Sequence, residues 1–164
     1  ISVQVNPLNQ WLNKKKKNDQ HVMGNVVYVI GSKVVEEGIL KLEEYYKLCQ
    51  VMLNCIDRGD QIFYVPHRGE AEEKIDYICQ KFSFLLKKID VPIELHLGQS
   101  EDLPKMIIGL VSAALVTISE CYSQIAVCAI APKYDDVENK YLAGIDNSVI
   151  YLKNSPKIRF IEWM

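Results

Sequence analysis

Short apolar segments alternate along the chain with longer amphipathic ones. Val26–Ile30 is a continuous run of β-branched and aromatic residues that ends at Gly31, which is typical of a strand buried on both faces. Comparable runs predict further strands at Gln61–Val65, Leu85–Ile89, Met106–Leu110 and Ile125–Ile130. The gaps between most of these runs are long enough for a helix.

Apolar residues in these gaps recur at helical spacing. Towards the end of the chain, the polar stretch Lys133–Asn147 predicts a loop, and Pro156–Met164 predicts a closing helix. Pro92 suits the start of a short helical turn at Ile93–Leu97. Full helices are predicted at Leu42–Ile56, Glu70–Phe82 and Ser112–Tyr122.

Strands separated by helices imply right-handed βαβ crossovers, and therefore a doubly wound, mostly parallel sheet with helices on both faces. The chain has 164 residues, of which 49% are hydrophobic and 24% charged, and this suits one globular domain. We therefore expect an α/β fold with a single Rossmann-like domain over residues 1–164. Because the chain begins with Ile1, we also expect it to be a piece of a longer protein.

Charge and cysteine content narrow the class of partner. The formal net charge of -2 argues against a nucleic-acid partner, which would favour a basic excess. The cluster Lys14–Lys17 is compatible with a solvated loop or with a patch that faces an anionic membrane. The 5 Cys form no C-x-x-C pair and are typical of reduced thiols in the cytoplasm.

Metal and membrane chemistry have little support in the sequence. The 3 His residues do not cluster with the cysteines as ligands of a structural metal would, so no metal is expected. No apolar run approaches the ~20 residues that span a bilayer. The expected location is therefore the cytoplasm, with peripheral contact at the inner membrane if the lysine cluster binds there.

Polar side chains follow the ends of the predicted strands. In a doubly wound sheet, ligands bind beyond the carboxyl ends of the strands, so these side chains are expected to gather at one edge. They are Gly31, Glu36 and Glu37 after the first strand, His67 and Arg68 after the second, Glu94 after the third, and Ser112 and Ala113 after the fourth.

This set suits transfer from a nucleotide-activated sugar. Ser112 at a helix start provides a hydroxyl and exposed amides for an anion. His67 and Arg68 can hold a phosphate and stabilise its charge as it leaves. Glu36 or Glu37 can take the proton of an attacking hydroxyl. Taken singly, each has another interpretation: a loop histidine, a simple helix cap, or a solvated acidic turn.

These residues resemble three signatures of bacterial sialyltransferases, especially the lipooligosaccharide sialyltransferase family. An acidic pair followed by Gly is found in Val35–Ile39, a histidine motif at a strand end in Tyr64–Glu70, and a serine motif opening a helix in Gly109–Leu115. A Pro-Ile-Glu sequence at Pro92–Glu94 falls between the last two. The resemblance covers residues 26–130.

The resemblance implies that the chain is the C-terminal, donor-binding lobe of a two-lobed GT-B glycosyltransferase. It implies CMP-sialic acid as donor, a galactose-terminated lipooligosaccharide or capsule as acceptor, and inverting transfer without a metal or other cofactor. Glu37 would be the base with Glu36 beside it, and His67 would meet the leaving phosphate. Ser112 would bind that phosphate, and Glu94 the ribose or base. The implied partners also include a missing N-terminal lobe and a second copy in a homodimer.

Three departures from the family pattern keep other functions open. The histidine motif reads Pro-His-Arg, so Arg68 stands where the family has Pro. Ala113 replaces the second hydroxyl residue of the serine motif, and the acidic pair is Glu-Glu. A transferase for another nucleotide sugar, such as a glucosyltransferase, and a noncatalytic nucleotide-binding or assembly domain are the alternatives.

Overall fold

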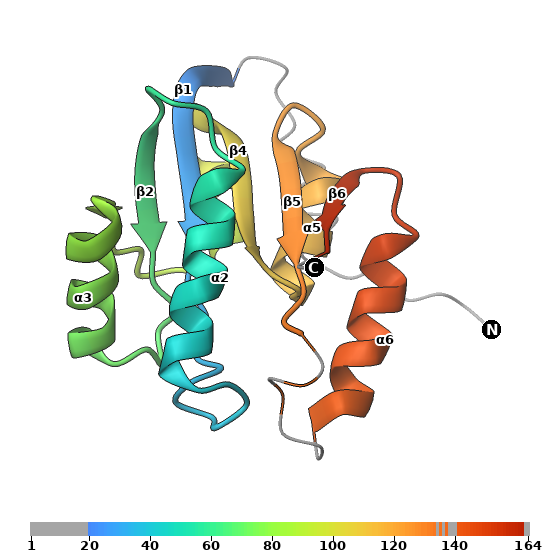
Figure 1. Cartoon of the computed structure of the whole chain (residues 1–164). Coiled ribbons are helices and arrows are strands. Elements are labelled where there is room, and N and C mark those ends of the chain that lie inside the picture. The colour runs from blue at the N-terminus through green and yellow to red at the C-terminus, as the bar shows by residue number, and fades with distance from the viewer. Residues whose placement is uncertain (1–19, 134, 136, 138–140, 163–164) are drawn as a thin grey trace.

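The protein is built on one six-stranded parallel sheet with the strand order β3-β2-β1-β4-β5-β6 (Figure 1). The structure, a computed structural model, describes residues 20–133, 135, 137 and 141–162. This strand order is that of the Rossmann fold, in which the chain moves to one side of β1 and then returns to continue on the other. The predicted α/β fold with a doubly wound sheet is confirmed.

The strands have their carboxyl ends at the same edge of the sheet, which is the lower edge in Figure 1. The two central strands, β1 and β4, lie side by side over most of their length, with a register shift between Met23 and Val27. The strands are β1 His21–Ile30, β2 Gln61–Val65, β3 Leu85–Leu86, β4 Asp102–Leu110, β5 Ala126–Ile130 and β6 Ile158–Ile161.

Helices cover both faces of the sheet. The face seen at the front of Figure 1 carries α2 and α3, and the far face carries α4 and α5, while α6 lies beside β6. This division follows from alternation along β1, where Val27 and Val29 pack under α2 and α3 and Val26 and Tyr28 pack on the other side. The helices are α2 Leu42–Asn54, α3 Glu72–Phe82, α4 Ile93–Gln99, α5 Ala113–Cys121 and α6 Leu142–Lys153.

Two predictions near the end of the chain are wrong. Ile158–Ile161 is a strand and not part of a closing helix, because it pairs in parallel with β5 and so satisfies its backbone groups there. The predicted loop Lys133–Asn147 includes the start of α6 at Leu142. Gly144 and the polar residues that follow it obscure the helical spacing of Ile145, Val149 and Leu152.

The remaining expectations have different outcomes. Leu85–Ile89 forms a strand of just two residues at the sheet edge, shorter than predicted. The Lys14–Lys17 cluster lies outside the described residues. The five cysteine thiols are free. Among the described helices, none has the length and apolar character to cross a membrane.

The central strands should dominate stability. Ile108 on β4 is fully buried in the core under α2 and α3, whereas Ile150 on α6 is 59% exposed. We expect Ile108→Ala to lower the free energy of unfolding by about 2–5 kcal/mol, because the substitution leaves a cavity. The same substitution at Ile150 should change it by less than about 0.5 kcal/mol. Urea unfolding curves check both; equal effects would contradict the buried position of β4.

Candidate active site

A small cleft lies at the carboxyl ends of β1 and β2, on the side where the strand order reverses between β1 and β4. Its volume is about 190 Å³. Ligands of doubly wound sheets bind at this topological switch point, because the loops diverge there and leave a crevice. The cleft is lined by the loops after β1 and β2, by the segment leading into α4, and by the first turn of α5.

Four of the residues singled out in the sequence line this cleft. They are Gly31 from the loop after β1, His67 and Arg68 from the loop after β2, and Glu94 from α4. Ala114 of α5 also lines the cleft. These side chains come from segments up to 63 residues apart between Gly31 and Glu94, so the sheet topology is what brings them together.

His67 is held by hydrogen bonds on its backbone and on its ring. Its backbone N–H donates to Oε2 of Glu70 at 2.6 Å, and its Nδ1 accepts from the backbone N–H of Gly69 at 3.1 Å. Because Nδ1 is an acceptor, the neutral ring carries its proton on Nε2. The ring is exposed, so Nε2–H is a donor that a ligand can reach.

Glu94 is anchored through its carbonyl group rather than through its carboxylate. The hydroxyl of Tyr122 donates to the Glu94 carbonyl at 2.7 Å and ties α4 to the end of α5. Burial, followed by the nearby Cys121 and Glu94, raises the pKa of Tyr122 to about 12. The hydroxyl therefore stays protonated at neutral pH and keeps donating to the Glu94 carbonyl, which holds this lining residue at the cleft.

Ser112 is the N-cap of α5, in extended conformation, and its hydroxyl makes no capping hydrogen bond. Neither Ser112 nor Ala113 lines the cleft, although Ala114 directly after them does. The start of α5 therefore borders the cleft, and its first-turn amides have the orientation that favours an anion.

Neither Glu36 nor Glu37 lines the cleft, and their side chains lie in different environments. Glu37 is exposed and forms an ion pair with Lys33 at 2.6 Å. The Glu36 side chain is 21% exposed and accepts from the Ala71 N–H and from Lys74, each at 2.9 Å. Partial burial alone would raise the Glu36 pKa, but these hydrogen bonds outweigh it and lower the pKa. Glu36 is thus engaged in a structural contact, while Glu37 is open to solvent.

A buried ion pair beneath the cleft was not predicted from the sequence. The side chains of Glu70 and Lys74 are 0% and 4% exposed, and Lys74 Nζ lies 2.9 Å from Glu70 Oε1. Lys74 also donates to the Ser32 carbonyl at 2.8 Å and to Glu36. The spacing of four residues between an acid and a base at a helix start was the available signal.

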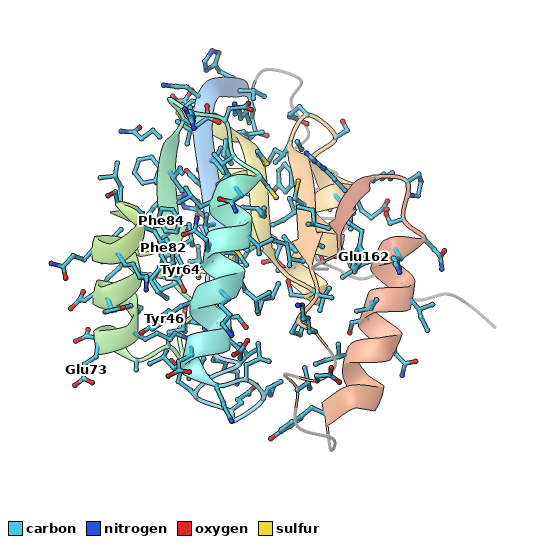
Figure 2. The ribbon with its side chains drawn as sticks, viewed as in Figure 1. Tyr46, Tyr64, Glu73, Phe82, Phe84 and Glu162 are labelled. Atoms are coloured by element: carbon cyan, nitrogen blue, oxygen red, sulfur yellow. The ribbon has the colours of Figure 1, made fainter. Side chains whose placement is uncertain are left out.

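Two buried tyrosines continue this network into the core. Tyr64 donates to Glu70 Oε1 at 2.6 Å and lies 3.0 Å, hydroxyl to hydroxyl, from Tyr45. The Tyr45 hydroxyl in turn accepts from the Ser32 N–H at 3.1 Å. Figure 2 shows Tyr64 in the layer between the sheet and the helices α2 and α3. Burial raises the pKa of both tyrosines, so both remain protonated.

Gly31 is required by this network. A Cβ atom at this position would lie 2.0 Å from Oε2 of Glu70 and 2.8 Å from the hydroxyl of Tyr64. Any side chain at position 31 would therefore displace the Glu70 carboxylate. The absence of a side chain at Gly31 leaves the space that the Glu70 carboxylate occupies.

Other hollows are larger but gather fewer of the predicted residues. One of about 410 Å³ lies at the ends of β5 and β6 and is lined in part by Pro132, Lys153, Phe160 and Glu162. Within the part of the chain that the structure describes, no group of three or more His, Cys, Asp or Glu side chains could hold a metal ion.

No model of a known protein family matches the chain, and no curated protein sequence matches it significantly.

Gly31→Ala should destabilise the protein because the added methyl group collides with Glu70. We expect the free energy of unfolding to fall by about 1–3 kcal/mol or more. The matched control is Gly24→Ala in β1, where a Cβ would meet nothing within 4 Å. This control should leave stability unchanged or raise it by up to about 1 kcal/mol. Similar denaturant midpoints for the two variants would show that position 31 has room for a side chain.

Glu36→Gln should lower stability in a pH-dependent way. The folded pKa of Glu36 is lowered, so its contribution is fully present above the unfolded value of about 4.5 and is lost as pH falls through the folded value. At pH 7 we expect the variant to be less stable by about 1.5–3 kcal/mol, the usual range for hydrogen bonds to charged groups.

Denaturant unfolding of wild type and Glu36→Gln from about pH 7 to pH 3 tests this dependence. The difference in unfolding free energy should narrow below about pH 4.5 and then disappear. Glu73→Gln, an exposed position on α3, controls for the loss of one negative charge. A difference that stays constant with pH would contradict the charged contact with Lys74.

Proposed function

We propose that the chain is the donor-binding domain of a glycosyltransferase that uses a CMP-activated sugar, with sialic acid as the sugar that the sequence resemblance implies. The observation that carries the proposal is the convergence of Gly31, His67, Arg68 and Glu94 on one cleft at the topological switch point. A His–Arg pair and a carboxylate in one small cleft are suited to a nucleotide, which has a phosphate at one end and hydroxyl groups beside it.

The phosphate is assigned to the side of the cleft formed by His67 and Arg68. The Nε2–H of His67 is free to donate because Nδ1 is occupied by Gly69. The Arg68 guanidinium adds a permanent positive charge and several donors. A CMP-sugar has one phosphate, and these are the two cationic or donor side chains among the residues that line the cleft.

The loop after β1 argues against a dinucleotide cofactor. In dinucleotide-binding Rossmann domains a glycine-rich turn leads directly from the first strand into a helix, and its amides hold the pyrophosphate. Here the N–H groups of Gly31 and Ser32 donate to Val65 and Tyr45, and α2 begins only at Leu42. The amides at the start of this loop are therefore used internally.

The size of the cleft supports binding of one part of the donor. Pockets that enclose drug-sized ligands usually measure about 300–1,000 Å³, more than the 190 Å³ here. We therefore assign the phosphate and the adjoining ribose to the cleft, with the ribose hydroxyls toward Glu94. The remainder of the donor would lie against the second lobe that the resemblance implies.

Glu37 is the better candidate for the general base. Glu36 is occupied by Ala71 and Lys74, whereas the Glu37 carboxylate is exposed and, among the described residues, is paired with Lys33. In the proposed reaction the acceptor oxygen forms a bond to the anomeric carbon as the bond from that carbon to the phosphate oxygen breaks. CMP leaves with the electron pair, stabilised by His67 and Arg68, and Glu37 accepts the proton of the acceptor hydroxyl.

Calorimetric titration with CMP, UMP and UDP tests the proposal. We expect CMP to bind, and His67→Ala to weaken CMP binding by more than about tenfold, which corresponds to about 1.4 kcal/mol. His21→Ala is the matched control, because His21 lies at the opposite end of β1 and its side chain is 75% exposed. This variant should bind CMP as the wild type does.

The other outcomes overturn specific parts of the proposal. Tight binding of UDP without binding of CMP would exclude sialyl transfer and favour another nucleotide sugar. Absence of binding by all three nucleotides would favour a noncatalytic domain. CMP affinity within about fivefold of wild type in His67→Ala, which corresponds to about 1 kcal/mol, would remove His67 from the phosphate site.

A further inference from the structure

We propose that Glu70 and Lys74 are positioning residues of the nucleotide site, which lock the loops after β1 and β2 to each other before a ligand binds. The inference rests on the proposed function, since it concerns how that site is held. Neither side chain reaches the cleft itself: both are buried beneath it, and neither is among its lining residues.

Lys74 holds the loop after β1. An ammonium group has three N–H donors, and the Lys74 group has three oxygen atoms around it. These are the Ser32 carbonyl at 2.8 Å, Glu36 Oε2 at 2.9 Å and Glu70 Oε1 at 2.9 Å. Two of the three belong to the loop that begins at Gly31, so one side chain of α3 fixes that loop at two points.

Glu70 holds the loop after β2. Its Oε2 accepts from the His67 backbone N–H at 2.6 Å, and its Oε1 accepts from the Tyr64 hydroxyl at 2.6 Å. Tyr64 lies in β2 itself, so the carboxylate joins the strand to the loop that follows. The path from Lys74 to the backbone of His67 therefore passes through a single carboxylate.

Stability alone does not account for a buried ion pair at this place. Removing two charges from water is costly, and an apolar pair of similar volume is often as stable or more so. An apolar pair could anchor α3 to the core, but it could not accept from the His67 amide or donate to the Ser32 carbonyl. The ion pair therefore adds hydrogen bonds that hold the loop after β1 and the loop after β2 in one position relative to each other.

This fixed relation matters for the side chain of His67. Its ring direction is set by the local backbone together with the hydrogen bond from Gly69 to Nδ1. With the backbone tied to Glu70, Nε2–H stays directed without loss of conformational freedom on binding. Without this tie, the loop would have to be ordered by the ligand, and affinity would fall.

The experiment compares Glu70→Gln, just before α3, with Glu73→Gln in the first turn of α3. Glu73 is exposed and points away from the fold in Figure 2, so it is a matched control for charge and side-chain type. An amide at position 70 keeps the shape but places an NH₂ group either against the His67 N–H or against both the Tyr64 hydroxyl and the Lys74 ammonium group. Two quantities are measured on the whole chain: CMP affinity by calorimetry, and the ring nitrogen signals of His67 by NMR without ligand.

We expect Glu70→Gln to fold and to bind CMP at least about tenfold more weakly than wild type, whereas Glu73→Gln binds as wild type. At about pH 8.5, where an ordinary imidazole is neutral, the wild-type His67 ring should show the Nε2–H form. In Glu70→Gln the His67 ring should show a mixture of the Nε2–H and Nδ1–H forms. Unchanged ring signals, or CMP affinity within twofold of wild type, would overturn the inference.

A second variant covers the case in which Glu70→Gln does not fold. The double substitution Glu70→Gln with Lys74→Gln leaves no unpaired buried charge, so it removes the charged contacts between the loops without that penalty. The same two readouts and thresholds apply to it. The NMR measurement also separates the two proposals: if the wild type binds no CMP, the proposed function fails, while the His67 ring signals still test the positioning role.

Discussion

The buried contact between Glu70 and Lys74 is the interaction on which the candidate site depends. It lies where α3 begins, and it reaches the loop after β1 through Ser32 and Glu36 and the loop after β2 through His67. A charged pair in this place requires complete hydrogen bonding, because any group left unpaired would cost more than the pair contributes. The tyrosines, the Gly31 backbone and the first turn of α3 are arranged around that requirement.

The sheet gives this network its place in the molecule. Because β1 and β2 are adjacent parallel strands, their following loops leave the same edge side by side, and α3 returns beside them. The strand order then reverses at β4, which opens the cleft that the network supports. Structural side chains therefore lie on the α2–α3 side of the loops, and the candidate ligand-binding side chains lie on the α4–α5 side.

Particular residues show how far sequence reasoning reached into the site. His67, Arg68 and Glu94 were found because each follows a strand, and strand ends are recognisable from apolar runs. Glu36 and Glu37 are adjacent in sequence, yet one contacts Lys74 and the other faces solvent. That difference depends on the path of the irregular loop after β1 and on its contacts with Ala71 and Lys74 at the start of α3. The helix is recognisable from its apolar spacing, but the loop has no periodic pattern from which these contacts could be predicted.

The sequence by itself determined five of the six strands, most of the helices and the sheet edge at which the candidate site residues lie, because these follow from short-range patterns of apolar and polar residues. The tertiary structure decided the remainder. Ile158–Ile161 forms the strand β6 because it pairs with β5. Position 31 requires glycine because the Glu70 carboxylate occupies the space that a side chain would fill. Pairing, burial and steric exclusion depend on residues distant in the chain, so only the folded molecule specifies them.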